Sequence, residues 1–523
     1  MSSRRIQDTP STSFGLITWL NHTRLFLPLK AIECQFEVCG PAAHVEVNQV
    51  FHQDNLYPLD CTYTFPLPGN AAAYRCEVEI NDRRIVAKVE ELSKARQIFE
   101  EKKAEGHRVA MAEMERENLF TLQLGNVQPD DLVVVRFAYF QLLDRLGDML
   151  SLQIPFCPGV RYIPGNPLIR SNRGKGVSDD TDQVPDASRI SPPRIDGDHP
   201  DAAVLHVHGK LTTAGEGFAT ISSPSHPIKV VCADATAVDI SLAHKGEVPD
   251  CDFVLRWREK RPTEQPRSKA WQVTGKDGER YMLAELVAPA DVEVAVDSKG
   301  QDLYFLVDRS GSMQGAKWTK TCEAFLSALR LLRPADRAWA TFFDDKCRDL
   351  AEGPLSPEAL LSDRSVLSVE KMGTGGGTVM LPALKHLFDA MKKQTREDRE
   401  AIVIIITDGQ VGNEDEILRM LADVRGTVHT FGIDTAVNDA FLRDLAETHG
   451  GACVLMTPND DIVAAVAALG ERLRKAGADQ AGSGYGLGFG RCAGRAKPVR
   501  VFHGDDPGAW TGGRDQWHAY SPR

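Results

Sequence analysis

The run LYFLVDRSGSM at residues 303–313 decides the fold of the second half of the chain. It begins as a short, nearly continuous apolar run, which is the pattern of a strand buried on both faces of a parallel sheet. Helical patterns separate it from four further runs of this kind: RAWATFF (337–343), AIVIIITD (401–408), TVHTFGI (427–433) and ACVLM (452–456). The alternation predicts a doubly wound α/β domain over residues 301–476, with helices on both faces of the sheet.

Upstream of this domain the pattern changes to short runs rich in valine, phenylalanine and tyrosine between turn residues, which is typical of antiparallel sheet. We expect a β sandwich or barrel over residues 12–143. One helix interrupts it in the stretch ELSKARQIFEEKKAEG (91–106), where Ser93 is a candidate N-cap and Gly106 a candidate stop. The fold class is therefore multidomain α/β plus β.

Two stretches, residues 166–201 and 477–523, are poor in the large apolar residues that a packed core needs. Residues 144–300 are expected to form a β-rich connecting region that contains a flexible loop at 166–201, rich in proline, glycine, serine and aspartate. Residues 477–523 form a glycine-rich tail, which we expect to be poorly ordered.

Length and charge exclude some classes of function. The chain has 523 residues, enough for three or four domains of about 150 residues. Its formal net charge of −12 disfavours general binding of nucleic acid. No apolar run approaches the roughly 18 to 20 residues that a membrane span requires, and Asn21, His22 and Arg24 interrupt the apolar stretch near the N-terminus. We expect a cytoplasmic protein whose eleven cysteines are free thiols.

Polar residues follow two of the predicted parallel strands, at the edge where open α/β sheets bind ligands. The first strand ends in the D-x-S-x-S run of Asp308, Ser310 and Ser312, and the AIVIIIT strand ends in Asp408. Between them in sequence lies a glycine-rich loop, GTGGGT (373–378), which leads into a helix and can bring a threonine hydroxyl close to both strand ends.

This combination of oxygen donors suits a small divalent cation. Mg²⁺ is usually held by one or two carboxylates and keeps several waters. Because neutral hydroxyls complete the set, a bound cation would keep net positive character and accept a carboxylate from another molecule. Asp308 could instead cap the following helix, but the coincidence of three such segments favours a metal site. Thr374 competes with Thr378 for the threonine position, and we prefer Thr378 because it directly follows the glycines.

From Asp302 to about Ala476 the chain resembles a von Willebrand factor type A (VWA) domain, which is Rossmann-like. The motifs LVDRSGSM (306–313), GTGGGT (373–378) and IITDG (405–409) resemble the three parts of its metal-ion-dependent adhesion site. The resemblance implies a cofactor, Mg²⁺ or Mn²⁺, and a protein partner that presents a carboxylate. Carried over residue by residue, the ligands would be Asp308, Ser310, Ser312, Thr378 and Asp408.

The N-terminal region resembles the VIT domain of vault-associated and inter-alpha-trypsin inhibitor proteins. The resemblance rests on residues 48–106 and 117–143, with Tyr63, the FPLP run at 65–68, Phe120 and the GNV run at 125–127 as its marks. The inhibitor heavy chains end in a D-P-H-F type sequence through which they are esterified. Here Asp506-Pro507 is followed by Gly508, so that chemistry is not carried over.

Three functional readings follow from these motifs. The first, which we favour, is a non-enzymatic adhesion or scaffold protein that grips an acidic partner through its cation. The second is a metal-assisted hydrolase that uses the same cation, with Asp344 or Asp345 as the general base. The third is a scaffold in which the VIT region packs against the VWA domain and masks the metal.

Overall fold

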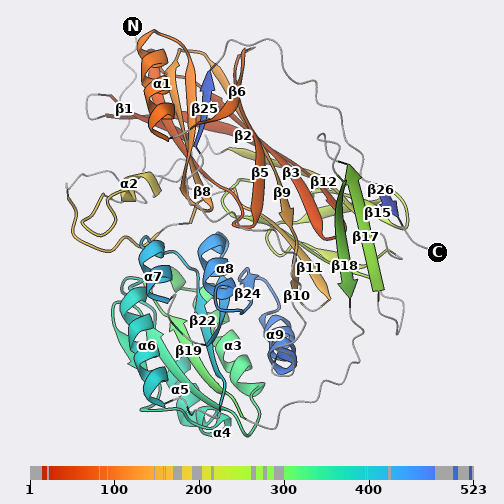
Figure 1. The fold of residues 1–523 in the computed structure, drawn as a ribbon, viewed down its shortest axis with the longest axis vertical. Helices are drawn as coiled ribbons and strands as arrows, with labels where there is room; N and C mark the ends of the chain where they lie inside the picture. The colour runs from red at the N-terminus through yellow and green to blue at the C-terminus, as the bar shows by residue number, and fades with distance from the viewer. Residues whose placement is uncertain are drawn as a thin grey trace.

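The computed structural model describes the chain in segments, and all structural statements below refer to them. They are residues 15–20, 23–81, 83–90, 92–146, 148–156, 158–159, 161–168, 179–190, 203–213, 217–260, 267–274, 280–287, 300–394, 396, 399–421, 424, 426–476, 499–503 and 518–520. Figure 1 shows a β-rich part above a smaller α/β domain. Among the described residues, no helix is long and apolar enough to cross a membrane.

The largest sheet of the β-rich part closes on itself. Its ends meet because β1 pairs with both β2 and β4. From β1 to β2, the strands of this ring stand in the spatial order β1 (Gly15–Leu20), β4 (Leu59–Pro66), β8 (Leu119–Val127), β7 (Val109–Arg116), β25 (Val499–His503), β6 (Arg83–Glu90), β5 (Ala71–Ile80), β9 (Leu132–Leu142), β3 (Ala42–His52) and β2 (Thr23–Cys39). The strands therefore form a barrel, which is one of the two arrangements that the alternating runs left open.

Strands from the expected connecting region extend this sheet beyond β2. They are β12 (Val204–Thr212), β15 (Ala237–Leu242) and β14 (Ile228–Cys232). β12 runs parallel to β2, with Val204 opposite Ala31 and Thr212 opposite Cys39. A Cβ added at Gly209 would lie 2.4 Å from the Phe36 ring, so the glycine makes room for that ring beneath β12.

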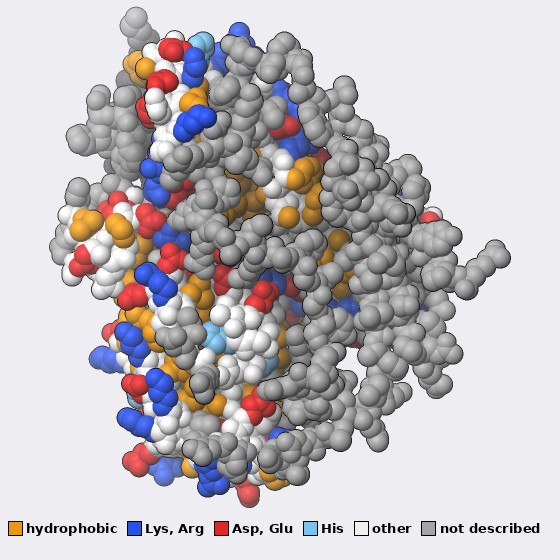
Figure 2. Space-filling model, viewed as in Figure 1, with side chains coloured by type: hydrophobic (Ala, Val, Ile, Leu, Met, Phe, Trp, Pro, Cys, Tyr) orange, Lys and Arg blue, Asp and Glu red, His pale blue; other side chains and the backbone are white. Residues whose placement is uncertain are grey.

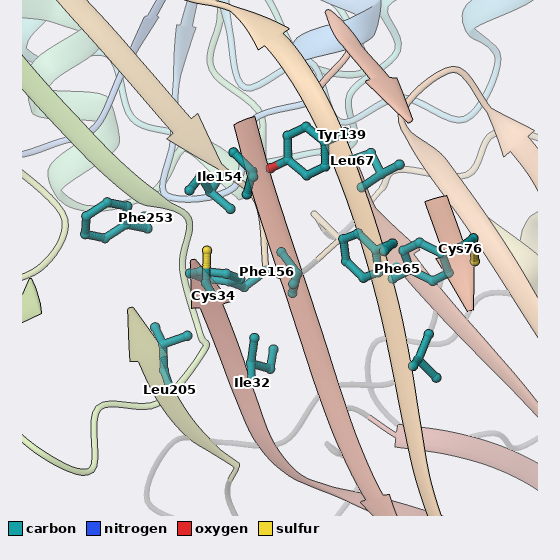
Figure 3. Close-up of a cluster of buried hydrophobic side chains, with 14 of the residues drawn as sticks. Ile32, Cys34, Phe65, Leu67, Cys76, Tyr139, Ile154, Phe156, Leu205 and Phe253 are labelled. Carbon is teal, nitrogen blue, oxygen red and sulfur yellow. The ribbon is translucent and has the colours of Figure 1, made fainter. Parts of the chain in front are cut away.

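Two smaller sheets complete the β-rich part. One contains β10 (Asp144–Leu146), β11 (Met149–Ile154), β16 (Phe253–Glu259) and β13 (Phe218–Ser222); the other contains β18 (Arg280–Val287), β17 (Arg267–Thr274) and β26 (His518–Tyr520). Side chains of β11 and β16 share one hydrophobic core with the barrel, where Ile154 and Phe253 lie near Cys34 of β2 (Figure 3). Along β11 the buried residues alternate with half-buried ones, whereas the first five residues of β16 are all buried.

The single helix predicted in the N-terminal region is α1 (Leu92–Ala104). Ser93 lies inside its first turn rather than before it. Gly106 follows its end with φ +84°, the left-handed conformation that favours glycine. Ala95 and Phe99 bury its apolar face together with Val109 and Met111 of β7.

The α/β domain has the predicted doubly wound architecture. Its sheet has the order β21 (Cys347–Asp349), β20 (Arg337–Phe343), β19 (Asp302–Asp308), β22 (Ala401–Thr407), β23 (Thr427–Ile433) and β24 (Cys453–Met456), and all neighbours pair in parallel except β21 with β20. One face is covered by η1 (Gly311–Met313), α3 (Ala316–Arg330), α4 (Pro357–Leu360), α5 (Asp363–Glu370) and α9 (Ile462–Ala476), and the other by α6 (Met380–Gln394), α7 (Glu414–Leu421) and α8 (Asp439–Glu447). The fold class is therefore confirmed.

The structure differs from expectation in two polar stretches. Within the expected flexible loop at 166–201, residues 179–190 are folded, and α2 (Ala187–Ile190) buries Val184, Ala187 and Ile190 against Leu119. A few apolar residues spaced for one helical turn thus outweigh the polar composition around them. In the glycine-rich tail, 499–503 and 518–520 are strands that pair with β6, β7 and β17. Residues 166–168 are also described, and Pro167 bridges Thr181. The remaining residues of both stretches lie outside the described residues.

The cysteines that the structure describes keep their thiols out of disulfides, in agreement with the prediction. Nine of the eleven are described, and none of these forms a disulfide. Cys34, Cys61 and Cys76 are buried in the barrel as small apolar side chains. Cys157 and Cys492 lie outside the described residues.

Polar contacts join the β-rich part to the carboxyl edge of the α/β sheet. They join residues that are far apart in the sequence. They include Gly69 N to Asp439 Oδ2 at 2.7 Å, Asp252 N to Thr435 O at 2.8 Å, Arg256 Nη2 to Asp460 Oδ2 at 2.7 Å and Arg443 Nη1 to Asp144 Oδ1 at 2.6 Å. The edge at which the ligand site is expected therefore faces the rest of the protein.

Glu414, the first residue of α7, is the centre of a buried polar cluster in this interface. Its carboxylate pairs with Arg161 and accepts hydrogen bonds from Arg116 Nε at 3.3 Å and Asn438 Nδ2 at 3.1 Å. Both arginines come from the β-rich part. Burial of a charge is costly unless the charge is paired. The Glu414 carboxylate and the two arginines therefore each offset the cost of burying the other.

Replacement of Glu414 by alanine should therefore destabilise the protein strongly. Because Arg161 would be left buried without its carboxylate, we expect the free energy of unfolding to fall by about 3–5 kcal/mol. Urea unfolding of the full chain measures this change. Glu416→Ala, on the exposed side of the same helix, is the matched control and should change stability by less than about 0.5 kcal/mol. Equal effects of the two substitutions would contradict the importance of the buried cluster.

Candidate metal centre

The parallel register of β19 and β22 brings two predicted ligands to one place. Asp308 is the last residue of β19, and Asp408 directly follows β22. The two strands pair from Asp302 opposite Ala401 to Val307 opposite Ile406, so they end side by side. Both carboxylates are fully buried, with 0% of each residue exposed.

Hydrogen bonds hold the Asp308 carboxylate in a fixed orientation. Its Oδ1 accepts from the backbone N–H of Ser310 at 2.9 Å, and its Oδ2 accepts from Thr407 Oγ1 at 2.7 Å. The Ser310 and Ser312 hydroxyl oxygens lie 3.0 Å apart. The D-x-S-x-S loop therefore gathers one carboxylate and two hydroxyls, as the sequence predicts.

The glycine-rich loop lies directly against the D-x-S-x-S loop. Gly311 N donates to Gly376 O at 3.1 Å, and Gly375 N donates to Arg309 O at 3.0 Å. Gly376 has φ +76°, which a residue with a side chain rarely adopts. Thr378, two residues further on, is buried, whereas Thr374 is half-buried. The choice of Thr378 over Thr374 as a ligand remains a prediction.

Asp408 carries an unsatisfied oxygen. Its Oδ1 accepts from Gln410 N at 3.1 Å, whereas its Oδ2 is buried and has no hydrogen-bond partner among the described residues. The nearest cation is Lys317, whose Nζ lies 3.7 Å from this oxygen and 2.8 Å from Asp434 Oδ1. An ammonium group thus stands beside the position where a cation is expected.

Sequence reasoning missed Lys317 and Asp434. Asp434 directly follows the apolar run 427–433, so the strand-end rule that identified Asp308 and Asp408 would also have identified it. Lys317 lies in the first turn of α3. Nothing in its sequence pattern indicates that this turn points toward the end of β23.

The electrostatics of the two buried aspartates favour a cation. Burial raises the pKa of Asp308 to about 7, and the nearby charge of Asp408 adds to this rise. Burial also raises the pKa of Asp408; the Lys317 ammonium opposes that rise and the Asp434 carboxylate adds to it. Like charges held in one buried site disfavour ionisation of both, so a positive charge would stabilise the pair.

The donor set therefore fits Mg²⁺ or Mn²⁺ better than it fits a softer ion. Two carboxylates with one unpartnered oxygen, and hydroxyls beside them, are hard oxygen donors. Within the described segments, no group of three or more His, Cys, Asp or Glu side chains is arranged to hold a metal. A site here would thus depend on the hydroxyls and on water.

The residues considered as bases for a hydrolase lie next to the glycine-rich loop. Asp344 is buried and accepts from Arg309 Nε at 2.9 Å. Burial raises the pKa of Asp344, but hydrogen bonds from Lys346 N, Asp345 and Arg309 outweigh it and hold the pKa below the usual value. A carboxylate committed to an ion pair in this way is a weak base. Asp345 is exposed.

The candidate site is partly open. Ser312 and Gly311 are exposed at the tip of the first loop, although Asp308, Ser310 and Asp408 are buried. The β-rich part therefore contacts this edge without covering the first loop completely.

Thr407 should contribute to the stability of this edge because its hydroxyl serves two partners. It donates to Asp308 Oδ2, and its oxygen accepts from Gly409 N at 3.0 Å. Thr407→Val keeps the shape but removes both bonds, so we expect the free energy of unfolding to fall by about 1–3 kcal/mol in urea unfolding. Thr319→Val, at an exposed position of α3, is the control. An unchanged stability of Thr407→Val would show that these bonds contribute little.

Comparison with known families finds one match in the N-terminal half of the chain and one in the C-terminal half. The model of the vault protein inter-alpha-trypsin (VIT) domain matches residues 29–139, and the model of the von Willebrand factor type A domain matches residues 302–465. These matches include the FPLP and GNV marks of the first resemblance and all five predicted ligands of the second.

Similar curated proteins are longer than this chain. Protein mono-ADP-ribosyltransferase PARP4 of Mus musculus is 23% identical over 430 residues, which are 81% of this chain and 20% of that protein. Von Willebrand factor A domain-containing protein 5A of Rattus norvegicus is 22% identical over 478 residues, 86% of this chain and 54% of that protein. The chain thus spans about a fifth of the first relative and about half of the second.

Among solved structures, the conserved hypothetical protein BatB from Bacteroides thetaiotaomicron matches 34% of this chain and 100% of that chain. The sequence identity is 15% and the TM-score is 0.29.

Proposed function

Because the chain contains a VIT domain followed by a VWA domain, we propose that it is a protein-interaction protein that works through a divalent cation. VWA domains are typically interaction and adhesion modules. In this proposal, Asp308, Ser310, Ser312, Thr378 and Asp408 hold Mg²⁺ or Mn²⁺, and a partner protein supplies a carboxylate.

One observation carries the proposal: the buried Oδ2 of Asp408, in the same site as the buried Asp308, accepts no hydrogen bond from the described residues. A buried carboxylate oxygen without a donor is costly. The only cation that the described contacts place against it is Lys317 at 3.7 Å, which is closer to Asp434. A small divalent ion would satisfy the Asp408 oxygen and offset the repulsion between the two aspartates.

The predicted ligands, a carboxylate in a fixed orientation and uncharged hydroxyls, support binding rather than catalysis. Asp308 is oriented by Ser310 N and Thr407 Oγ1, so its position is fixed before a cation arrives. The hydroxyls contribute no charge, and the cation therefore supplies a Lewis-acidic position for an anionic ligand. Ser312 lies on the exposed side, where such a ligand could approach.

Long-range electrostatics would not bring an acidic partner to this protein. The formal net charge is −12. On the face shown in Figure 2, Lys and Arg side chains are interspersed with Asp and Glu along the α/β domain, and neither sign forms a continuous field. Recognition would therefore rest on the short-range contact at the cation.

Calorimetry with Mg²⁺ and with Mn²⁺ tests the metal site directly. We expect one cation per wild-type chain and no measurable binding to Asp308→Asn or Asp408→Asn, because each substitution removes one of two ligand charges while keeping the shape. Asp415→Asn removes an exposed carboxylate on α7 and should bind as the wild type does. Binding that survives both site substitutions would overturn the proposal.

The partner is sought in a second step. Affinity capture compares wild type with Asp308→Asn, each in Mg²⁺ and in chelator. A partner of the proposed kind is retained only by wild type in Mg²⁺, and changing its essential Asp or Glu to the amide abolishes retention. A partner that is retained equally in Mg²⁺ and in chelator, and equally by wild type and Asp308→Asn, would contradict the cation-mediated contact.

Lys317 should limit the affinity for the cation. Lys317→Met removes a positive charge that now neutralises Asp408 and Asp434. At an effective dielectric constant of about 20, a unit charge several ångströms away contributes enough to tighten Mg²⁺ binding by roughly tenfold or more. Calorimetry measures this change. Lys320→Met, which only breaks a pair with Glu323 on the same helix, is the control. Weaker binding by Lys317→Met would show that the lysine positions the site.

A further inference from the structure

A short segment outside the VWA match contacts two of the three loops of the candidate metal centre. We call residues 161–163 the strap. Tyr162 N donates to Gln410 O at 2.9 Å, and Tyr162 forms an isolated parallel bridge with Val411. Gln410 lies two residues after Asp408 and donates its own N–H to that carboxylate. The strap is therefore bonded to the loop that carries one predicted ligand.

The side chain of Tyr162 reaches the glycine-rich loop. A Cβ added at Gly377 would lie 2.4 Å from Cε2 of the Tyr162 ring and 2.7 Å from its Cζ, well inside van der Waals contact. The ring thus packs directly on the backbone of Gly377, the residue before Thr378. Tyr162 therefore touches the second and the third loop at the same time.

Buried neighbours anchor the strap on both sides. Arg161 Nη1 donates to Val411 O at 3.3 Å and pairs with Glu414, and its side chain is 3% exposed. Ile163 packs close to Gly412, where an added Cβ would lie 2.9 Å from Ile163 Cδ1. These contacts leave little freedom to the segment 410–414, which follows Asp408.

We propose that Tyr162, supported by Arg161, is a positioning residue for the metal centre. This residue lies outside the VWA domain, which contains all the predicted ligands. It holds the loop of Thr378 against the loop of Asp408. The inference rests on the proposed function. Because coupling between two sites is reciprocal, bound Mg²⁺ should in turn strengthen the docking of the strap. The affinity for the cation would then depend, through these loops, on how the β-rich part is docked against the VWA domain.

A double-mutant cycle with Tyr162→Ala and Gly377→Ala tests this contact. Tyr162→Ala removes the ring, and Gly377→Ala displaces it by a clash, so each should weaken Mg²⁺ binding, by roughly two- to thirtyfold. In the double variant the methyl group introduced at position 377 fits into the space left by the Tyr162 ring. Gly377→Ala should therefore cause no further loss of Mg²⁺ affinity beyond that of Tyr162→Ala. Tyr162→Phe keeps the ring and the backbone bond and should restore the wild-type affinity. Calorimetry with Mg²⁺ alone gives the affinities of the wild type and of these four variants.

Hydrogen exchange gives a second readout that does not depend on metal affinity. In chelator, Tyr162→Ala should speed amide exchange in residues 407–411 relative to wild type and to Tyr162→Phe. In Mg²⁺, the wild-type strap should exchange more slowly than in chelator, whereas Asp308→Asn should show no difference. Circular dichroism verifies that each variant is folded; if Tyr162→Ala is not, Gly377→Ala and Tyr162→Phe still decide the question.

The outcomes separate this inference from the proposed function. If Asp308→Asn binds Mg²⁺ as the wild type does, the metal site itself is wrong. If Asp308→Asn loses binding while Tyr162→Ala and Gly377→Ala keep the wild-type affinity, the site stands and the positioning role of the strap is wrong. Additive effects in the double variant would show that the two residues do not act through their contact.

Discussion

Two buried carboxylates lie close together at the carboxyl edge of the α/β sheet, and the groups around them are arranged to offset the cost of that proximity. Asp308 and Asp408 come together because β19 and β22 run parallel and end side by side. Their mutual repulsion and their burial both oppose ionisation. Three features offset this cost: backbone and hydroxyl donors around Asp308, the ammonium of Lys317, and the approach of loops that add hydroxyl groups.

The same loops also form the interface with the β-rich part. Asn438 shows how closely the two roles are joined: its N–H donates to Asp408 O at 3.2 Å, and its side chain donates to Gly409 O and Glu414. Asn118, from β-rich sequence far upstream, donates to Asn438 Oδ1 at 3.2 Å. A displacement at the interface would therefore reach the backbone of Asp408 through two or three hydrogen bonds. Such chains are the physical means by which distant parts of a protein become coupled.

Much of the α/β domain could be predicted from the sequence because its rules are local. Buried parallel strands leave continuous apolar runs, and the strand-end rule selects Asp308 and Asp408 without knowledge of the rest. The pairing of Lys317 with Asp434 depends on how α3 lies on the sheet, which no local pattern encodes. The parallel pairing of β12 with β2 joins residues that are far apart in the chain, and α2 packs against Leu119 and pairs through Arg189 with Glu115, both distant in the sequence. Tertiary packing decides such features, and the sequence around them resembles a linker.

The pairing of β12 with β2 also determines where this chain can be divided. A fragment that stops at residue 143, where the sequence pattern changes, would contain β2 but not its neighbour β12. Residues 31–39 of β2 would then present an open row of peptide groups beside Ile32, Cys34 and Phe36, whose side chains are otherwise buried. A long, apolar, unpaired strand edge is a template for aggregation. The region that looks like a connection in the sequence thus supplies, in the folded protein, the strand that pairs with this edge of the barrel.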